Sequence, residues 1–397
     1  MLPLAGITVV SLEQAVAAPF ATRQLADLGA RVIKVERPGP GDFARGYDET
    51  VKGLSSHFVW LNRSKESVTL DLKSEAGITA LRALVDRADV FVQNLAPGAA
   101  ARLGMDAATW RARRPELVHV SISGYGDVGP YMSKKAYDLL VQCEAGLVSI
   151  TGTPETPSKV GISVADIAAG MYAYTGVLSS LIRRLRTGEG ATIEVSMLEA
   201  LAEWMGFPLN FATYGGSAPA RSGASHAAIA PYGPFACAGG EFVFLGIQNE
   251  REWATFCSSV LEQPDLAGAD RFANNSLRVA HRSELTETVE AAFANLAAEE
   301  VVARLDEARI ANARLRGVAE LAEHPQLAAR DRWRTVDSPA GPLRQLLPPA
   351  MPDGVEPRFD PIPTVGEHTD AILAEFGLSE TGSSAEHALT HEQERQP

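Results

Sequence analysis

The sequence predicts an α/β fold: a large domain with a doubly wound, mostly parallel, Rossmann-like sheet, and a smaller α+β second domain. Two observations support this prediction. Strand-like apolar runs alternate with helical patterns up to about residue 125, and the composition changes after residue 213. Repeated βα units with short connections form parallel sheets that are covered by helices on both faces. A chain of 397 residues is long enough for two domains with separate cores.

The expected elements of the large domain follow one another at short intervals. Runs rich in Val, Ile, Leu and Thr predict strands at 7–12, 31–36, 67–72, 89–94, 117–123 and 191–197. Apolar residues at steps of three and four predict helices at 17–30, 74–87, near 106–113 and from about 166 to 186. Ligands of such sheets gather at the carboxyl ends of the strands, so the loops that follow the strands are the first place to search for function.

Composition divides the chain into four segments. We expect the large domain at 1–213 and a small domain at 214–325, which begins with a linker rich in Gly, Ala, Ser and Pro. Residues 326–378 are expected to return onto the large domain. Residues 379–397 contain almost no apolar side chains, and we predict a disordered tail there.

Charge and cysteine content narrow the function classes. The formal net charge of −13 argues against a nucleic-acid or membrane partner, since both require a basic face. Cys143, Cys237 and Cys257 are far apart and predict a reduced, cytoplasmic protein. The N-terminus lacks the basic region of a signal peptide, and no apolar run reaches the length of a membrane span. His387 and His391 have metal-ligand spacing but no third ligand, so we predict no metal site.

Asp166 is an isolated acid near the start of the last predicted helix. Its neighbours are apolar, and no basic residue lies between Lys159 and Arg183. The stretch from Ser163 to Asp166 fits a capping box, in which the acid at N3 reaches back to the N-cap amide. Asp166 could instead be the N-cap itself, or a reactive carboxylate. This stretch alone leaves the three interpretations open.

Basic residues and a glycine-rich turn follow several expected strands. These loops converge on one edge of a doubly wound sheet, where basic residues together would form an anion site suited to a phosphate-bearing ligand. The basic residues are Arg37, Arg63, Lys65, Arg102, Lys134 and Lys135. The stretch "GYGDVG" (124–129) matches G-x-G-x-x-G, but it follows the fifth strand rather than the first. A glycine-rich turn is therefore favoured over a nicotinamide site.

Six ordered stretches resemble the class III (CaiB/BaiF-type) coenzyme A transferases. They are "EQAVAAPFATRQLADLGARVIKVERPGPGD" (13–42), "NRSKESVTLDLK" (62–73), "NLAPGAAARLG" (94–104), "SISGYGDVGPY" (121–131), "AYDLLVQCEAGL" (136–147) and "ADIAAGMYAYTGVLSSL" (165–181). The resemblance covers the whole large domain in order and continues more weakly to about residue 378.

The resemblance implies that Asp166 is the catalytic nucleophile. Asp166 would attack an acyl-CoA to form an aspartyl anhydride, and the released CoA thiolate would return to give an aspartyl-CoA thioester. An acceptor carboxylate would then take over the CoA. We expect the helix dipole and nearby N–H groups to favour the ionised carboxylate and to oppose its desolvation. An ionised, poorly solvated carboxylate suits attack on a thioester.

The resemblance also implies a set of ligand contacts and an assembly. Coenzyme A would be a substrate and not a tightly bound cofactor, with a small carboxylic acid as the second substrate. Lys65 and Leu70 belong to a segment that lines the adenine and phosphate region in the family, and Tyr137 matches a position that faces the reacting centre. Family members are interlocked homodimers. The contacts carried over by motif are Gln14, Arg37, Lys65, Leu70, Asn94, Arg102 and Tyr137.

The acid substrate and two rival functions stay open. The stretch 222–235 resembles a subgroup that acts on succinate-type C4–C5 dicarboxylates such as itaconate, mesaconate or citramalate, and Arg221 and His226 could meet a distal carboxylate. Oxalate/formate and carnitine-type exchanges are alternatives. A 2-methylacyl-CoA racemase on the same fold would need a histidine base where this chain has Tyr137. A non-catalytic CoA-binding protein is the third possibility. The glycine-rich lid of the family is unassigned, with 214–225 and 237–241 as candidates.

Overall fold

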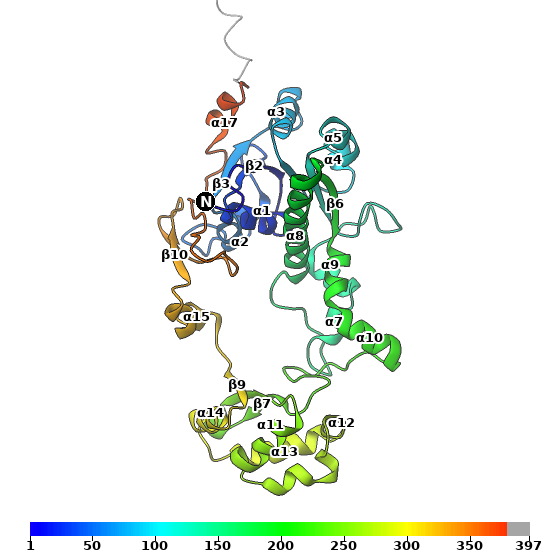
Figure 1. Cartoon of the computed structure of the whole chain (residues 1–397), viewed down its shortest axis with the longest axis vertical. Coiled ribbons are helices and arrows are strands. Elements are labelled where there is room, and N and C mark those ends of the chain that lie inside the picture. Colours follow the sequence, from blue (N-terminus) through cyan, green and yellow to red (C-terminus); the bar gives the residue numbers. More distant parts are fainter. Residues whose placement is uncertain (379–397) are drawn as a thin grey trace, which may run out of the picture. The chain divides into compact units, whose positions relative to one another are not determined.

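A computed structural model describes residues 1–378 and divides the chain into two compact units (Figure 1). The first unit comprises Met1–Ala145, Ile162–Trp204 and the chain from Asp331 onward, and the second comprises Gly146–Gly161 and Met205–Arg330. The domain boundaries expected from composition stay predictions, and the expected tail at 379–397 lies outside the described residues.

A six-stranded sheet in the order β3-β2-β1-β4-β5-β6 forms the centre of the first unit. All neighbouring strands pair in parallel, which confirms the predicted doubly wound sheet. The order reverses between β1 and β4, so the loops after these two strands border the crevice where such sheets bind ligands. The strands are β1 (Thr8–Leu12), β2 (Arg31–Glu36), β3 (Lys65–Thr69), β4 (Val90–Gln93), β5 (Val118–Ser123) and β6 (Ala191–Ser196).

Strand β3 begins two residues earlier than the sequence pattern predicts. Lys65 pairs with Val32 at the amino end of the strand, and Ser67 pairs with Lys34. These polar side chains face a buried polar network rather than an apolar core, and for this reason the hydrophobic pattern does not mark the start of the strand.

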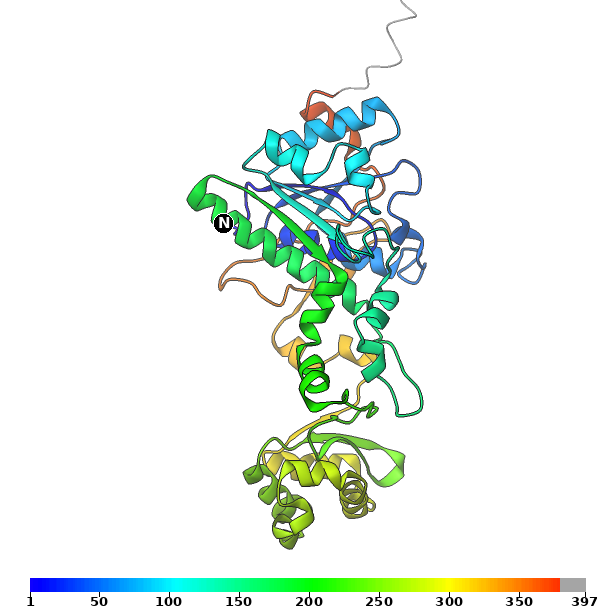
Figure 2. The ribbon, with the colours of Figure 1, turned by 90° about the vertical axis from the view of Figure 1, so that its right-hand side faces the viewer.

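Helices cover both faces of the sheet. On one face, α3 (Glu75–Asp86), α5 (Ala107–Arg113) and α17 (Thr369–Glu375) pack against the strands through a common apolar core. On the other face, α1 (Ala17–Asp27) packs against the long helix α8 (Val164–Thr187), which also runs along β5 and β6 (Figure 2). Parallel strands buried on both sides explain the near-continuous apolar runs in the sequence.

Helix α8 owes its close packing to small residues on its buried face. Ala165, Ala169 and Ala173 recur at steps of four and are almost fully buried. A Cβ atom at Gly170 would lie 2.6 Å from the carbonyl oxygen of Ala17, so only glycine allows α1 to approach so closely. Gly188 ends the helix in the left-handed conformation, with φ of 75°.

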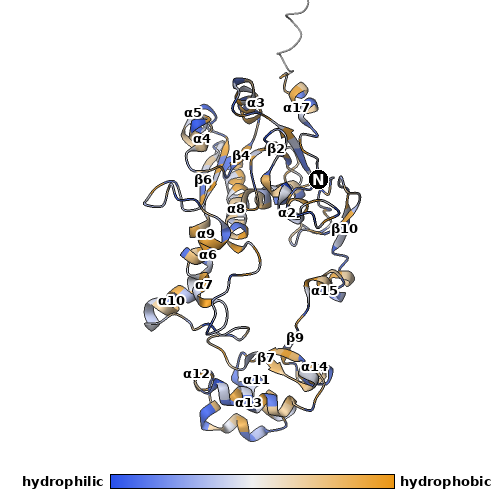
Figure 3. Ribbon diagram, turned by 180° about the vertical axis from the view of Figure 1, so that it is seen from behind, coloured by the Kyte–Doolittle hydropathy of each residue, from blue (hydrophilic) through white to orange (hydrophobic). Residues whose placement is uncertain are grey.

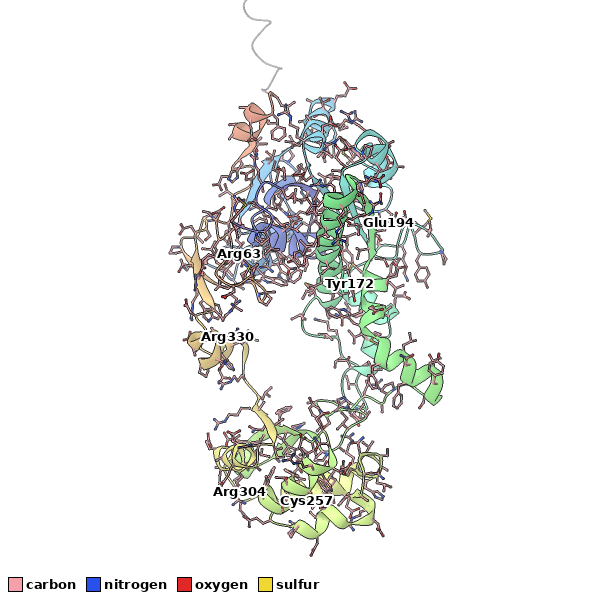
Figure 4. All side chains as sticks on the ribbon, in the orientation of Figure 1. Arg63, Tyr172, Glu194, Cys257, Arg304 and Arg330 are labelled. Carbon is pink, nitrogen blue, oxygen red and sulfur yellow. The ribbon has the colours of Figure 1, made fainter. Side chains whose placement is uncertain are left out.

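The rest of the first unit consists of short elements around the sheet. These are the 3-10 helix η1 (Phe43–Gly46), α2 (Ser56–Leu61), α4 (Ala99–Arg102), α6 (Asp138–Glu144), α9 (Met197–Trp204) and the antiparallel pair β10 (Trp333–Val336) and β11 (Leu343–Leu346). Arg63, labelled in Figure 4, ties this C-terminal hairpin to α1, because its guanidinium donates to Asp27 at 2.7 Å and to Gln345 at 2.9 Å.

The second unit is a small antiparallel sheet with helices. Strands β7 (Tyr232–Ala236), β8 (Phe242–Gly246) and β9 (Ala311–Arg314) pair antiparallel in that order. Leu285, Val289 and Phe293 recur every fourth residue on α13 and are buried, and hydrophobic and hydrophilic residues accordingly alternate along its ribbon (Figure 3). The helices are α7 (Leu147–Ile150), α10 (Gly206–Gly215), α11 (Glu250–Thr255), α12 (Asn275–Ala280), α13 (Arg282–Phe293), α14 (Ala298–Glu307), α15 (Val318–Ala322) and α16 (Pro325–Ala329).

Candidate active site

Asp166 lies in the first turn of α8 as the third helical residue. The helix begins at Val164, and its N-cap, Ser163, makes no side-chain capping hydrogen bond. Both capping interpretations of Asp166 are therefore wrong: the capping box does not form, and Asp166 is not the N-cap. Within residues 1–378, no hydrogen bond to the Asp166 carboxylate is present. It is a half-buried acid without a partner.

Asp138 takes the capping role from outside the helix. Its Oδ1 atom accepts a hydrogen bond from the backbone N–H of Ala165 at 2.8 Å, and its Oδ2 atom accepts one from Gln142 at 2.6 Å. Asp138 therefore accepts from one of the free N–H groups at the start of α8, which we had expected to stabilise the Asp166 carboxylate. It also places a second carboxylate close to Asp166.

Burial and the charge of Asp138 together raise the pKa of Asp166 to about 7. Any support that the helix terminus gives to the ionised form is opposed here by burial and by Asp138, which occupies one free N–H group there and adds a like charge. A carboxylate with a pKa near neutrality is more basic and more nucleophilic than an ordinary one, while a useful fraction stays ionised.

The loop between β1 and α1 approaches the same end of α8. Helices α1 and α8 run in parallel, because successive residues of α1 contact successive residues of α8. Ala17 lies against Gly170, and Gln24 donates to Met171 at 3.4 Å. Further along, the charge of Asp27 acts on Tyr174. Residues that precede Ala17 therefore lie toward the N-terminal turn of α8. Gly170 and Asp166 are four residues apart and share a face, about 6 Å apart along the axis.

Tyr47 belongs to the same neighbourhood. Its pKa is raised to about 12 by burial and by the charges of Asp42 and Asp166, with a contribution from Tyr137. Its ring packs edge-on against His57, with 5.4 Å between the ring centroids. Tyr47 thus brings a phenol near the Asp166 carboxylate.

A buried ionic network lies under the β1–α1 loop. The Lys65 ammonium contacts Glu13 at 2.6 Å, and the Lys34 ammonium contacts Glu13 at 3.3 Å and Asp42 at 2.8 Å. All four side chains are fully buried. Burial alone would raise the pKa of Glu13, but Lys65 and Lys34 and a hydrogen bond from Thr22 lower it to about 2. Glu13 is therefore a permanently ionised structural group.

Two of the residues expected at the CoA nucleotide lie in the interior. Lys65 is the first residue of β3 and so lies at the amino end of that strand. Its ammonium also donates to the Pro19 carbonyl and to the Asn62 side chain, both at 3.1 Å. The Leu70 side chain belongs to the apolar core beneath α3 and α17. These positions do not fit direct contacts to a CoA phosphate, since the Lys65 side chain is fully buried.

The other expected contacts lie in loops at the carboxyl ends of the strands. Gln14 follows β1, and Asn94 follows β4 and bonds to the backbone of Gln14. Arg37 follows β2, is exposed, and donates to the carbonyl of Gly41 at 2.8 Å. Arg102 is exposed in the last turn of α4. Tyr137 is the N-cap residue of α6 and is 67% exposed, so its ring is available to a ligand.

The predicted cluster of basic residues forms only in part. Arg63 is buried against Asp27, as described above, and Lys65 is bound to Glu13. Lys134 pairs with Glu144 and lies 4.2 Å from the centroid of the Tyr131 ring. Among the described residues of the cluster, Arg37, Arg102 and Lys135 remain exposed and form no ion pair.

The glycine-rich turn at 124–129 borders a cavity of about 410 Å³ at the ends of β4, β5 and β6. Its lining includes the carboxylates of Asp127, Glu194 and Glu199, and the pKa of Glu194 is raised by burial and by Asp127. An acidic lining does not suit a dinucleotide phosphate, so the structure gives no support to a nicotinamide site. Glu194 is labelled in Figure 4.

Arg221 and His226 lie in the second unit. The Arg221 guanidinium donates to the carbonyl groups of Thr153, Ser149 and Pro154 at 2.8, 3.2 and 2.7 Å, so it fastens the Gly146–Gly161 segment to the rest of that unit. His226 stacks on Tyr232 at 5.3 Å. With its guanidinium engaged by three carbonyls, Arg221 is poorly suited to reading a substrate carboxylate.

Residues 1–378 contain no group of three or more His, Cys, Asp or Glu side chains placed to hold a metal ion. Across the same residues, no helix combines the length and the apolar character needed to cross a bilayer.

Comparison with known proteins decides the family. A model of "CoA-transferase family III" matches residues 4–369. The chain belongs to CoA-transferase family III. A relative named succinate–glutarate CoA-transferase, from Agrobacterium fabrum, is 31% identical over 384 residues, which are 94% of this chain and 96% of that protein. Another, named acetyl-CoA:oxalate CoA-transferase, from Acetobacter aceti, is 36% identical over 331 residues, 83% of this chain and 85% of that protein.

A solved family structure agrees with the fold. The crystal structure of a CAIB/BAIF family protein from Brucella suis superposes with a TM-score of 0.82 at 32% identity, covering 94% of this chain and 99% of that one. Membership of family III confirms the resemblance read from the six sequence stretches, and with it a CoA-transferase activity.

Sequence reasoning missed three residues in the surroundings of Asp166 and the β1–α1 loop. Asp138 directly follows Tyr137 and could have been noticed as a second acid in that stretch. Asp42 closes "RPGPGD", where an acid after a glycine turn is typical of a loop cap. Tyr47 carries no local signal, because its closeness to Asp166 depends on the fold.

Proposed function

We propose that the protein transfers CoA from succinyl-CoA to a second dicarboxylic acid, with Asp166 as the nucleophile. The observation that carries the proposal is the lone carboxylate of Asp166, unpaired and of raised pKa, in the first turn of α8. A structural acid in such a place would have a cap or a cation as a partner. Membership of CoA-transferase family III supplies the reaction class.

In the proposed reaction, Asp166 attacks the thioester carbonyl of succinyl-CoA, the C–S bond breaks, and an aspartyl anhydride and the CoA thiolate result. The thiolate attacks the Asp166 carbonyl, releases succinate, and leaves an aspartyl-CoA thioester. The acceptor carboxylate then attacks this thioester to form a second anhydride. Attack of the thiolate on the acceptor's carbonyl completes the product thioester and restores the Asp166 carboxylate.

Burial of Asp166 serves two ends in this mechanism. It raises the basicity of the nucleophile, and it keeps water from the anhydrides, which hydrolyse readily. The exposed guanidinium groups of Arg37 and Arg102 and the ring of Tyr137 are the groups we assign to the CoA molecule. The family resemblance further supports a homodimer, and three unpaired cysteines fit the reducing cytoplasm.

Dicarboxylates are proposed because the acids named for both relatives above include them: succinate, glutarate and oxalate. Since Arg221 is engaged by backbone carbonyls, we do not assign it to the distal carboxylate, and His226 stays a candidate. The position where a racemase would carry its histidine is Tyr137, so the racemase alternative is not favoured.

An acceptor screen with succinyl-CoA tests the proposal. Product thioesters would be identified by mass spectrometry for glutarate, itaconate, mesaconate, citramalate, oxalate, and butyrate as the monocarboxylate control. We expect kcat/KM for the best dicarboxylate to exceed that for butyrate at least about a hundredfold, because a buried group left without its carboxylate partner costs several kcal/mol. Equal rates with butyrate would overturn the dicarboxylate assignment, and no product with any acid would overturn the transferase.

A further inference from the structure

The loop between β1 and α1 is held by side chains distant in sequence. Asn94, at the end of β4, accepts a hydrogen bond from the Gln14 N–H at 2.9 Å and donates one to the Gln14 carbonyl at 2.8 Å. Both ends of the Asn94 amide are thus engaged by a single residue of the loop. On the next residue, the Ala15 N–H donates to Asp42 at 3.1 Å.

This loop adopts a conformation that it would not keep by itself. Ala15 has φ of 61°, in the left-handed region, which is unfavourable for a residue with a Cβ atom. The carbonyl and the N–H of the peptide that joins Gln14 to Ala15 are held by Asn94 and Asp42, and these hydrogen bonds offset that cost. Strained backbone of this kind persists only where the surroundings over-determine it, and it is concentrated at functional sites.

Asp42, the second side chain that holds the loop, is itself held by buried neighbours. It is fully buried, pairs with Lys34 at 2.8 Å, and accepts from the Ala44 N–H at 2.9 Å. Lys34 in turn contacts Glu13, the residue before Gln14. Glu13, Lys34, Asp42 and the loop therefore form a closed ring of contacts. Asn94 joins this ring from β4, across the point where the strand order reverses between β1 and β4.

The loop lies beside the reacting carboxylate. Because α1 and α8 run in parallel, the residues before Ala17 lie toward the first turn of α8, where Asp166 is located. Asp42 links the two sides independently, because it bonds to Ala15 and its charge, like that of Asp166, acts on Tyr47. Gln14 makes no side-chain hydrogen bond among the described residues, so its amide is available to a ligand there.

We propose that Asn94 is a positioning residue: it holds the Gln14 peptide so that Gln14 is presented beside Asp166, and it does not itself contact CoA. The proposal rests on the proposed function, in which Asp166 is the reacting group. It replaces the direct CoA contact that the family resemblance implied for Asn94, since the amide that would make this contact is already used.

A double-mutant cycle tests the proposal. Asn94→Ala should lower kcat on the order of a hundredfold, the cost of a misplaced group, and leave KM for succinyl-CoA nearly unchanged. Gln14→Ala should show the same pattern, and the double variant should be no worse than Gln14→Ala alone. A rise in KM with unchanged kcat, or losses that multiply in the double variant, would overturn it.

Ala15→Gly provides a rescue that a merely structural or direct-contact role would not give. Glycine adopts a positive φ without cost, so Ala15→Gly in the Asn94→Ala background should restore about fivefold in kcat. The same change in the wild-type background, the matched control, should have little effect. Absence of any rescue would argue that loop conformation is not what Asn94 controls.

Hydrogen exchange separates this proposal from the proposed function. Amides of the peptide spanning residues 12–22 should exchange faster in Asn94→Ala than in the wild type, whether or not any acid is turned over. Unchanged exchange would overturn the clamp. A wild-type protein with no CoA transfer but a loosened loop in Asn94→Ala would instead overturn the proposed function and leave the clamp in place.

Discussion

Glu13 and Asp166 are two carboxylates of the same unit with opposite properties. Glu13 is fully buried, yet two lysines lower its pKa to about 2. Asp166 is only half-buried, yet burial and the charge of Asp138 raise its pKa to about 7. Burial acts to raise the pKa of both acids, and the two lysines beside Glu13 reverse that effect, whereas Asp166 has a like charge beside it instead.

This difference fits a structural role for Glu13 and the proposed chemical role for Asp166. Glu13 joins β1 to Lys34 and Lys65, and its removal leaves two buried ammonium groups with Asp42 as the one remaining carboxylate of the network. Asp166 has no partner to lose, and its free lone pairs are available to a substrate.

Replacing Asp166 has the largest expected effect. Asp166→Asn should reduce CoA transfer by at least about a thousandfold, the scale on which removal of a nucleophile acts, and leave the far-UV circular dichroism spectrum unchanged. The matched control is Asp106→Asn, since Asp106 is the N-cap of α5 and asparagine caps equally well. Retention of a tenth of the wild-type rate in Asp166→Asn would return Asp166 to a structural role.

Replacing Glu13 should instead destabilise the fold. Glu13→Gln leaves Lys34 and Lys65 short of a counter-charge, so urea unfolding should show a loss of about 3–5 kcal/mol. The double variant Glu13→Gln/Lys65→Met should lose less than the two single variants added together, because it removes the charge and its partner at once. A fully stable Glu13→Gln protein would contradict the role given to the network.

Asp138 should set the pH at which the enzyme works. Asp138→Asn keeps an oxygen that can accept from the Ala165 N–H but removes the like charge beside Asp166. The pKa of Asp166 should fall, and the acid limb of kcat/KM against pH, expected near 7 in the wild type, should move to lower pH. An acid limb at the same pH in both proteins would show that Asp138 does not act on the reacting group.

The smallest effect is a pair of opposite slopes in stability. The Glu13 pKa is lowered from 4.5 to about 2, so its stabilising contribution is present above about 4.5 and is lost as the pH falls toward 2. The Asp166 pKa is raised from 3.8 to about 7, so the wild type loses stability relative to Asp166→Asn as the pH rises between these values. Thermal unfolding of both variants and the wild type from pH 3 to 8 measures this, and slopes of the same sign would contradict the comparison.

The sequence predicted the sheet and singled out Asp166, but it did not predict the surroundings of that residue. Strands β1, β2 and β5 were located to within a residue because they are apolar on both faces. The isolated charge of Asp166 drew attention to this residue, but the family resemblance alone implied its role as nucleophile. Lys65 was assigned to a phosphate because the hydrophobic pattern could not show that its side chain turns inward to Glu13. Asp138 and Tyr47 depend on contacts between segments distant in sequence, which no local pattern contains.

Trapping of a covalent intermediate tests whether the Asp166 carboxylate is the nucleophile. The wild-type protein would be incubated with succinyl-CoA and then treated with hydroxylamine or borohydride, followed by digestion and mass spectrometry. If Asp166 is the nucleophile, we expect a hydroxamate or an alcohol at Asp166. This product should form only with succinyl-CoA present and should be absent from Asp166→Asn. An unmodified Asp166 peptide during active turnover, or modification of another carboxylate, would contradict it.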